Sequence, residues 1–83
     1  MMLVVRITGW RGGRPPLVPP QAIARTFAET ANMGERESML AATRLMRGKS
    51  VDAYFDSAEH AAAESFLEET HRIGLESKLY NDQ

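Results

Sequence analysis

The chain has 83 residues, of which 43% are hydrophobic and 25% charged, and its formal net charge is −1. This is the composition of a folded protein and the length of a single domain with one core, which we expect over residues 1–83. The chain contains no cysteine, which excludes disulfides, thiolate zinc sites and cysteine nucleophiles.

The N-terminal apolar run, Met1–Val5, is too short for the core of a signal peptide or for a membrane span. We therefore expect a cytoplasmic protein with no membrane partner.

The small net charge conceals two halves of opposite sign. Residues 1–50 contain eight basic and three acidic residues, a net charge of +5, whereas residues 51–83 contain two basic and eight acidic residues, a net charge of −6. Separated charges favour docking to an acidic protein partner or self-association. The alternative is that the imbalance has no function.

The first predicted element is a strand over Met2–Thr8, which is rich in β-branched and apolar residues. Alternation places Leu3, Val5 and Ile7 on one face. Because this strand is the most apolar of the three that we predict, we expect it in the middle of the sheet. The next segment, Gly9–Pro20, holds all four prolines and half of the glycines, and it is predicted to be a loop.

A first helix follows the loop. It begins at Pro19 or Pro20, since proline is tolerated in the first helical turn, and it runs to about Ala31 with Ile23 and Phe27 toward the core.

A second helix starts after Gly34, which acts as the N-cap with Glu37 three residues later, and it ends at Arg47-Gly48-Lys49. Helical spacing predicts an apolar face made of Met39, Ala42, Thr43 and Met46.

The rest of the chain predicts a strand, a helix and a strand in succession, at Val51–Phe55, Asp56–Ile73 and Leu75–Tyr80. Both strands alternate, so each has one face toward solvent. Asp56 or Ser57 caps the helix, with Glu59 in the reciprocal position to Asp56, and Gly74 supplies the positive φ at the helix end. The residues expected on the inner face of this helix are Ala62, Ala63, Phe66, Thr70 and Ile73.

The order β-α-α-β-α-β predicts an α/β two-layer sandwich, in which three helices cover one face of a three-stranded sheet. The first strand is expected in the middle, antiparallel to the other two. The residues expected in the core are Val5, Ile7, Ile23, Phe27, Met39, Met46, Phe55, Phe66, Ile73 and Leu79.

Three turns resemble those of two related groups of small domains. Asn32–Glu37 is similar to the turn between the two helices in ClpS adaptors and in the C-terminal domain of the bacterial ribosomal stalk protein of the large subunit. Arg47-Gly48-Lys49 is similar to the glycine turn before their second strand, and Gly74 to the glycine before their third. The resemblance implies the same fold and a role as an adaptor or docking platform without chemistry of its own.

Two differences from these families bear on function. ClpS adaptors carry an acidic stretch after the first strand that recognises the α-amino group of a substrate, whereas this chain has Arg11-Gly12-Gly13-Arg14, which should repel an amine. The stalk domain docks translation factors through lysines and an arginine on its two-helix face. Here the two helices carry Arg25, Arg36 and Arg44 instead.

The residue types that carry catalysis favour other roles in this chain. His60 and His71 lie on one helix at a separation of about 16 Å, from 1.5 Å per residue, so they cannot share a metal ion. His60 more simply pairs with Glu64, one turn later. Gly12-Gly13 has neither the lysine and serine of a phosphate loop nor a dinucleotide-binding spacing. We therefore expect no enzymatic activity, no catalytic or metal-binding residues and no cofactor.

The cluster of Trp10, Arg11 and Arg14 is the most suggestive local feature. An exposed indole beside arginines can stack on a base or clamp an acidic peptide. Alternatively, the indole folds back over the edge of the sheet and the arginines are only solvated.

The open face of the sheet is a second candidate surface. Arg6, Tyr54 and Tyr80 are expected there, as aromatic residues are on RNA-binding sheets, but Asp52 and Glu76 share the face.

The favoured function is a non-enzymatic protein-interaction module that docks an acidic protein partner, or a second copy of itself, through the two-helix face and the loop after the first strand. The alternative is binding of nucleic acid, as RNA, by the basic N-terminal half, with an affinity that falls steeply with salt. The expected partner-binding residues are Trp10, Arg11, Arg14, Arg25, Arg36 and Arg44.

Overall fold

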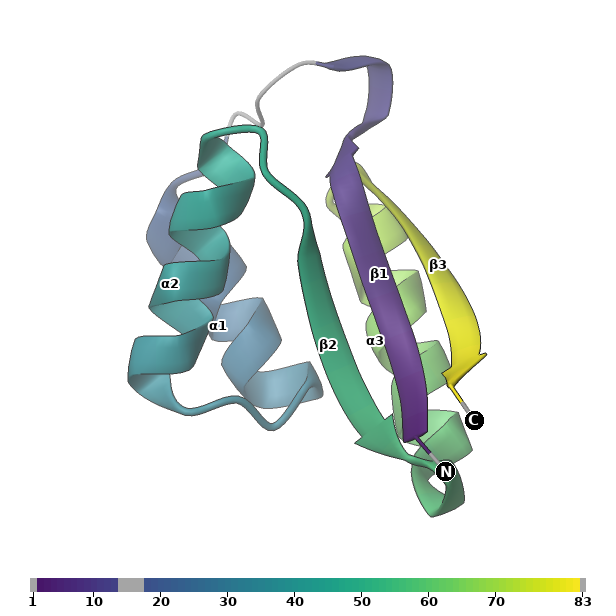
Figure 1. Cartoon of the computed structure of the whole chain (residues 1–83). Helices are drawn as coiled ribbons and strands as arrows, with labels where there is room; N and C mark the ends of the chain where they lie inside the picture. The colour runs from purple at the N-terminus through teal and green to yellow at the C-terminus, as the bar shows by residue number, and fades with distance from the viewer. Residues whose placement is uncertain (1, 14–17, 83) are drawn as a thin grey trace.

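The computed structural model describes residues 2–13 and 18–82, and over these it has the predicted order of elements (Figure 1). Two short 3-10 helices precede the first and third α-helices. The fold is an α/β sandwich, as predicted. Its elements are β1 (Met2–Trp10), η1 (Arg11–Gly13), α1 (Pro20–Thr30), α2 (Glu35–Met46), β2 (Val51–Asp56), η2 (Ser57–Glu59), α3 (His60–Arg72) and β3 (Leu75–Asp82).

The sheet confirms the predicted topology. The strand order is β2-β1-β3, and both outer strands run antiparallel to β1. A bulge between Ile7 and Gly9, in the pairing with β3, lets β1 continue to Trp10, two residues beyond its predicted end. The N-terminus therefore lies at one end of the middle strand and the C-terminus beside it (Figure 1).

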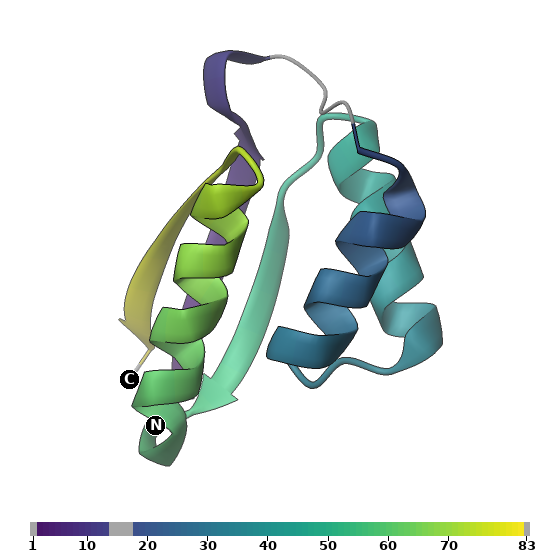
Figure 2. The same ribbon diagram turned by 180° about the vertical axis from the view of Figure 1, so that it is seen from behind.

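The helices build one core against the inner face of the sheet. α3 contacts all three strands, and α1 contacts both α2 and α3. Figure 2 shows α3 in front of the sheet, with the α1–α2 pair beside it next to β2. No described element covers the outer face of the sheet, which is left to its own side chains.

Phe66 of α3 lies at the centre of the core. Its ring meets Phe27 of α1 edge-on, with centroids 5.3 Å apart, and Phe55 of β2 at 5.6 Å. All three rings are buried, as predicted. The other predicted core residues that are buried are Val5, Ile7 and Ile23, and those packed partly buried against the core are Met46, Ile73 and Leu79.

α2 turns a different face toward the core from the one predicted. Its buried residues are Ser38, Ala41, Ala42 and Leu45, so Ala42 is the only fully buried residue of the predicted set. Met39 is 36% exposed, and its assignment to the core was wrong, as was that of Thr43 to the inner face. Small side chains on the observed face allow α2 and α1 to approach closely, which the longer Met39 would prevent.

The capping box before α3 is formed as predicted. Asp56 accepts a hydrogen bond from the backbone of Ala58 at 3.1 Å, and Glu59 accepts one from the backbone of Asp56 at 3.2 Å. Gly74 closes the helix with φ of 95°. Gly34 is the N-cap of α2, but no side chain caps that helix.

Candidate interaction surfaces

The indole of Trp10 is buried, which contradicts the alternative of an exposed indole. It is 8% exposed and belongs to the core, and its Nε1 donates a hydrogen bond of 2.9 Å to the carbonyl oxygen of Leu45 in α2. Such a ring cannot stack on a nucleic-acid base. Instead it fastens the end of β1 to the last turn of α2.

Arg11 is exposed and lies beside the end of α3. Its Nη2 donates to the carbonyl oxygen of His71 at 3.0 Å, and its backbone N–H donates to the carbonyl oxygen of Gly74 at 2.7 Å. One guanidinium nitrogen is therefore bonded within the fold, while the rest of the group faces outward. Arg14, the other arginine of the predicted cluster, lies outside the described residues.

The loop after β1 lies against the turn after α2. Gly12 and Gly13 of the loop and Gly48 of the turn line a shared hollow of about 520 Å³. Arg47 and Lys49 flank Gly48 in the chain and are both exposed. The loop and the end of the two-helix pair thus form one continuous end of the molecule.

The outer side of α2 combines exposed apolar and basic side chains. Leu40 is 60% exposed and Met39 36% exposed. Arg36 and Arg44 lie four residues before and after Leu40, and residues at this spacing share one side of a helix. We call Arg36, Met39, Leu40 and Arg44 the α2 patch.

Each of the three predicted arginines of the helices lines a separate hollow beside this patch, together with Glu35 or Glu37. Arg25 of α1 lines a hollow of about 370 Å³ together with Met39, and Arg36 lines one of about 530 Å³ together with Met39 and Leu40. Arg44 and Leu40 line a third. Sequence reasoning found the arginines but missed the two apolar side chains between them.

The positive charge is concentrated toward the C-terminal end of α2. Glu35 and Glu37 occupy the first turn of the helix, but no acidic residue occurs between Ser38 and Ser50. Arg44 is held in this region because its Nε and Nη2 both lie 3.4 Å from the carbonyl oxygen of Ser50.

Acidic side chains gather on α3 instead. Glu64 and Glu68 are exposed, and the Nδ1 of His60 lies 3.6 Å from a carboxylate oxygen of Glu64. Arg72 donates two hydrogen bonds to one oxygen of Glu69, at 3.1 and 2.6 Å. These bonds lower the pKa of Glu69 and raise that of Arg72. α1 contacts both α2 and α3, and the exposed arginines of α2 lie on a different helix from these glutamates.

The outer sheet face holds the polar and aromatic residues predicted there. Arg6 donates to both carboxylate oxygens of Asp52, at 2.9 and 3.2 Å, and its guanidinium lies 5.5 Å from the ring centroid of Tyr80. The hydrogen bonds to Asp52 raise the pKa of Arg6. Tyr54 and Tyr80 are both exposed.

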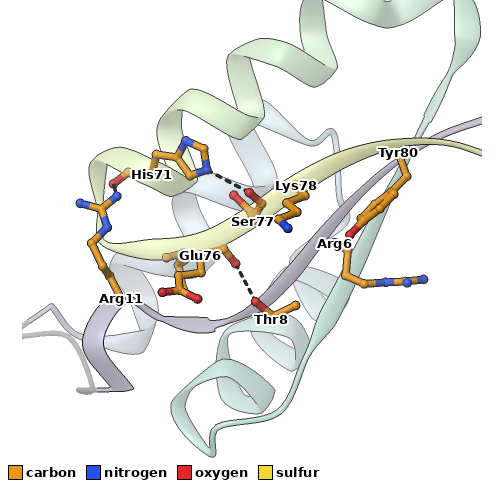
Figure 3. A pocket seen from close by; sticks show the side chains of 9 residues that line it. Arg6, Thr8, Arg11, His71, Glu76, Ser77, Lys78 and Tyr80 are labelled. Carbon is orange, nitrogen blue, oxygen red and sulfur yellow. Dashed lines mark hydrogen bonds between the residues drawn. The ribbon is translucent and has the colours of Figure 1, made fainter.

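A pocket of about 390 Å³ lies along β3 (Figure 3). Arg11, Lys78 and Glu76 line it, so its charge is mixed. The ring of His71 hydrogen-bonds the carbonyl oxygen of Ser77 at 3.0 Å, as the dashed line in Figure 3 marks. The carbonyl oxygen of Ser77 in the outer strand β3 is therefore already hydrogen-bonded within the fold.

The described residues contain no group of three histidine, aspartate or glutamate side chains that could hold a metal ion. Likewise, no helix in the described part of the chain is both long and apolar enough to cross a membrane.

Comparisons with protein-family models, with curated proteins and with solved structures gave no match.

Proposed function

We propose that this chain is a non-enzymatic protein-interaction module that docks an acidic protein partner through the α2 patch. The observation that carries the proposal is the exposed apolar pair Met39 and Leu40 in the middle of α2, with Arg36 and Arg44 one helical turn from Leu40 on either side.

The chemistry of the patch defines the partner. Covering Met39 and Leu40 removes apolar surface from water, which contributes about 25 cal/mol per Å² buried. The arginines bind carboxylates through paired hydrogen bonds and steer an acidic partner into one orientation. The partner is therefore an acidic segment with at least one apolar side chain between its carboxylates.

The loop after β1 extends this surface at the C-terminal end of α2. The Trp10 bond to Leu45 fixes the end of β1, directly before Arg11–Gly13, and Arg47 and Lys49 add positive charge to this end of α2. The resemblance of the element order to adaptor and stalk domains supports the same kind of role.

The test starts with partners recovered by affinity capture from the native cell, whose binding to the purified chain is then measured. Reversing Arg25, Arg36 and Arg44 to glutamate should weaken binding at least tenfold and flatten its salt dependence, and Leu40→Ser alone should weaken it as well. Arg72→Glu, a reversal on α3, is the matched control and should leave affinity unchanged. If both patch variants are folded and bind as the unmodified chain does, the proposal is wrong.

Binding of RNA by the basic half stays the second candidate. Burial of Trp10 leaves the loop without an exposed aromatic ring for stacking, so the geometry favours a protein partner. Titration with labelled single-stranded RNA at low salt distinguishes RNA binding from docking of a protein partner. Tight binding that falls steeply with salt and is lost in the triple arginine variant would replace the docking proposal.

A further inference from the structure

The outer sheet face carries a row of apolar and aromatic side chains that no described element covers. Val4 lies opposite Tyr54 on β2 and opposite Tyr80 on β3. Val4 is 4% exposed although it does not belong to the core cluster, whereas Tyr54 and Tyr80 are 57% and 46% exposed. The two tyrosines therefore enclose Val4 between them and leave much of their own surface in water.

The next row on the same face is charged. Arg6 lies opposite Asp52 on β2 and opposite Lys78 on β3. β2 thus contributes a carboxylate to this row and β3 contributes an ammonium group. The guanidinium of Arg6 lies between them and is hydrogen-bonded to the carboxylate.

We propose that this face binds the same face of a second copy of the chain, with the two-fold axis parallel to β1. Such a rotation places β2 of each copy over β3 of the other and keeps each residue at its height along the strands. Tyr54 then faces Tyr80 of the second copy, and Asp52 faces Lys78 of the second copy. The symmetry makes each contact twice.

The dimensions of packed sheets suit this arrangement. Sheets stack about 10 Å apart, which leaves room for opposed tyrosine rings to interdigitate. The two Arg6 side chains meet near the axis, but each is already neutralised by its own Asp52.

Charge argues against nucleic acid on this face. Asp52, Asp56 and Glu76 outnumber Arg6 and Lys78 here, and nucleic-acid affinity depends on unbalanced cations. A three-stranded face is at the small end of specific interfaces. We therefore expect a dissociation constant of about 10 µM to 1 mM, in the range of weak transient complexes. This surface is distinct from the α2 patch, and the inference does not depend on the proposed function.

Sedimentation velocity over this concentration range measures the association. The unmodified chain should shift from monomer to dimer, and Tyr54→Ser combined with Tyr80→Ser should weaken dimerisation at least tenfold. Leu40→Ser, which removes an exposed apolar side chain on α2, is the matched control and should dimerise like the unmodified chain. A monomer at about 1 mM, or a dimer insensitive to the tyrosine changes, overturns the proposal.

Charge exchange tests the two-fold arrangement itself. Asp52→Lys alone opposes two lysines at each contact, and Lys78→Asp alone opposes two aspartates, so each variant should be monomeric. An equimolar mixture of the two restores an opposite pair at both contacts and should dimerise. Circular dichroism checks that both variants are folded. If the mixture stays monomeric while the unmodified chain dimerises, the proposed arrangement is wrong.

Discussion

The indole nitrogen of Trp10 donates a 2.9 Å hydrogen bond to the carbonyl oxygen of Leu45, which joins the end of the middle strand to the last turn of α2. The same oxygen accepts a second hydrogen bond from the backbone of Gly48 at 3.0 Å. This carbonyl therefore keeps one partner if the indole is removed.

Two replacements of Trp10 distinguish the contribution of its hydrogen bond to stability from the contribution of its packing. Trp10→Phe keeps an aromatic ring in the core and should cost about 1 kcal/mol of unfolding free energy for the lost bond. Trp10→Ala also leaves a cavity and should cost about 3–5 kcal/mol. Urea denaturation followed by circular dichroism measures both. Equal losses in the two variants would show that the ring contributes no packing.

Phe66→Ala removes the ring at the centre of the core. The loss of contacts with Phe27 and Phe55 should cost about 3–5 kcal/mol, which is enough to unfold much of a small domain. Phe66→Leu fills most of the space and is the control, with a smaller loss. An unchanged melting temperature in the alanine variant would contradict the position of α3.

Leu40 and Leu45 are a matched pair on one helix. Leu45 is buried and Leu40 is mostly exposed. Leu45→Ala should therefore cost about 2–5 kcal/mol, whereas Leu40→Ala should change stability by less than about 0.5 kcal/mol. Thermal melts of the two variants report which face of α2 meets the core. The reverse order would contradict the observed inner face of α2.

The hydroxyls of Thr70 and Ser77 form a buried bond of 2.7 Å between α3 and β3. Thr70→Val keeps the shape of the side chain but leaves the Ser77 hydroxyl without this partner, which should cost about 1–3 kcal/mol. Ser77→Ala in the same chain removes the orphaned group and should recover part of that loss. A double-mutant cycle measures the coupling, and purely additive losses would mean that the two hydroxyls do not interact.

The ion pair of Glu69 and Arg72 predicts a direction of titration. Hydrogen bonds from Arg72 stabilise the charged carboxylate, so the pKa of Glu69 is below its ordinary value. The contribution of the pair to stability is therefore present above the unfolded pKa, about 4.3, and is lost as the pH falls through the folded pKa. NMR titration of the Glu69 carboxyl should show the low pKa, and Arg72→Gln should return it toward the ordinary value. A Glu69 pKa that does not respond to Arg72→Gln would exclude the pair in solution.

Local sequence signals predicted most of the fold because each of them depends on a few neighbouring residues. The capping box at Asp56 marked the start of η2, which leads directly into α3, the positive φ of Gly74 marked the end of α3, and alternation identified the strands.

The inner face of α2 was predicted wrongly for a physical reason. Apolar residues surround most of this helix, at Met39, Leu40, Ala41, Ala42, Leu45 and Met46. Periodicity then allows more than one face, and the fit against α1 decides between them. The position of the Trp10 indole likewise depends on Leu45, 35 residues away in the chain.

Of the three strands, the middle one comes first in the chain, yet it is fully paired only when the last strand has formed. Leu3 of β1 pairs with Phe55 of β2 and with Asn81 of β3. A nascent chain that has not yet reached Leu75 therefore leaves one edge of an apolar strand open, and open edges pair readily with other chains. Helix contacts within the α1–α2 pair are local and form early, whereas closure of β1 awaits the last strand. Pairing of β3 with β1 is therefore the step that covers the open edge of the middle strand.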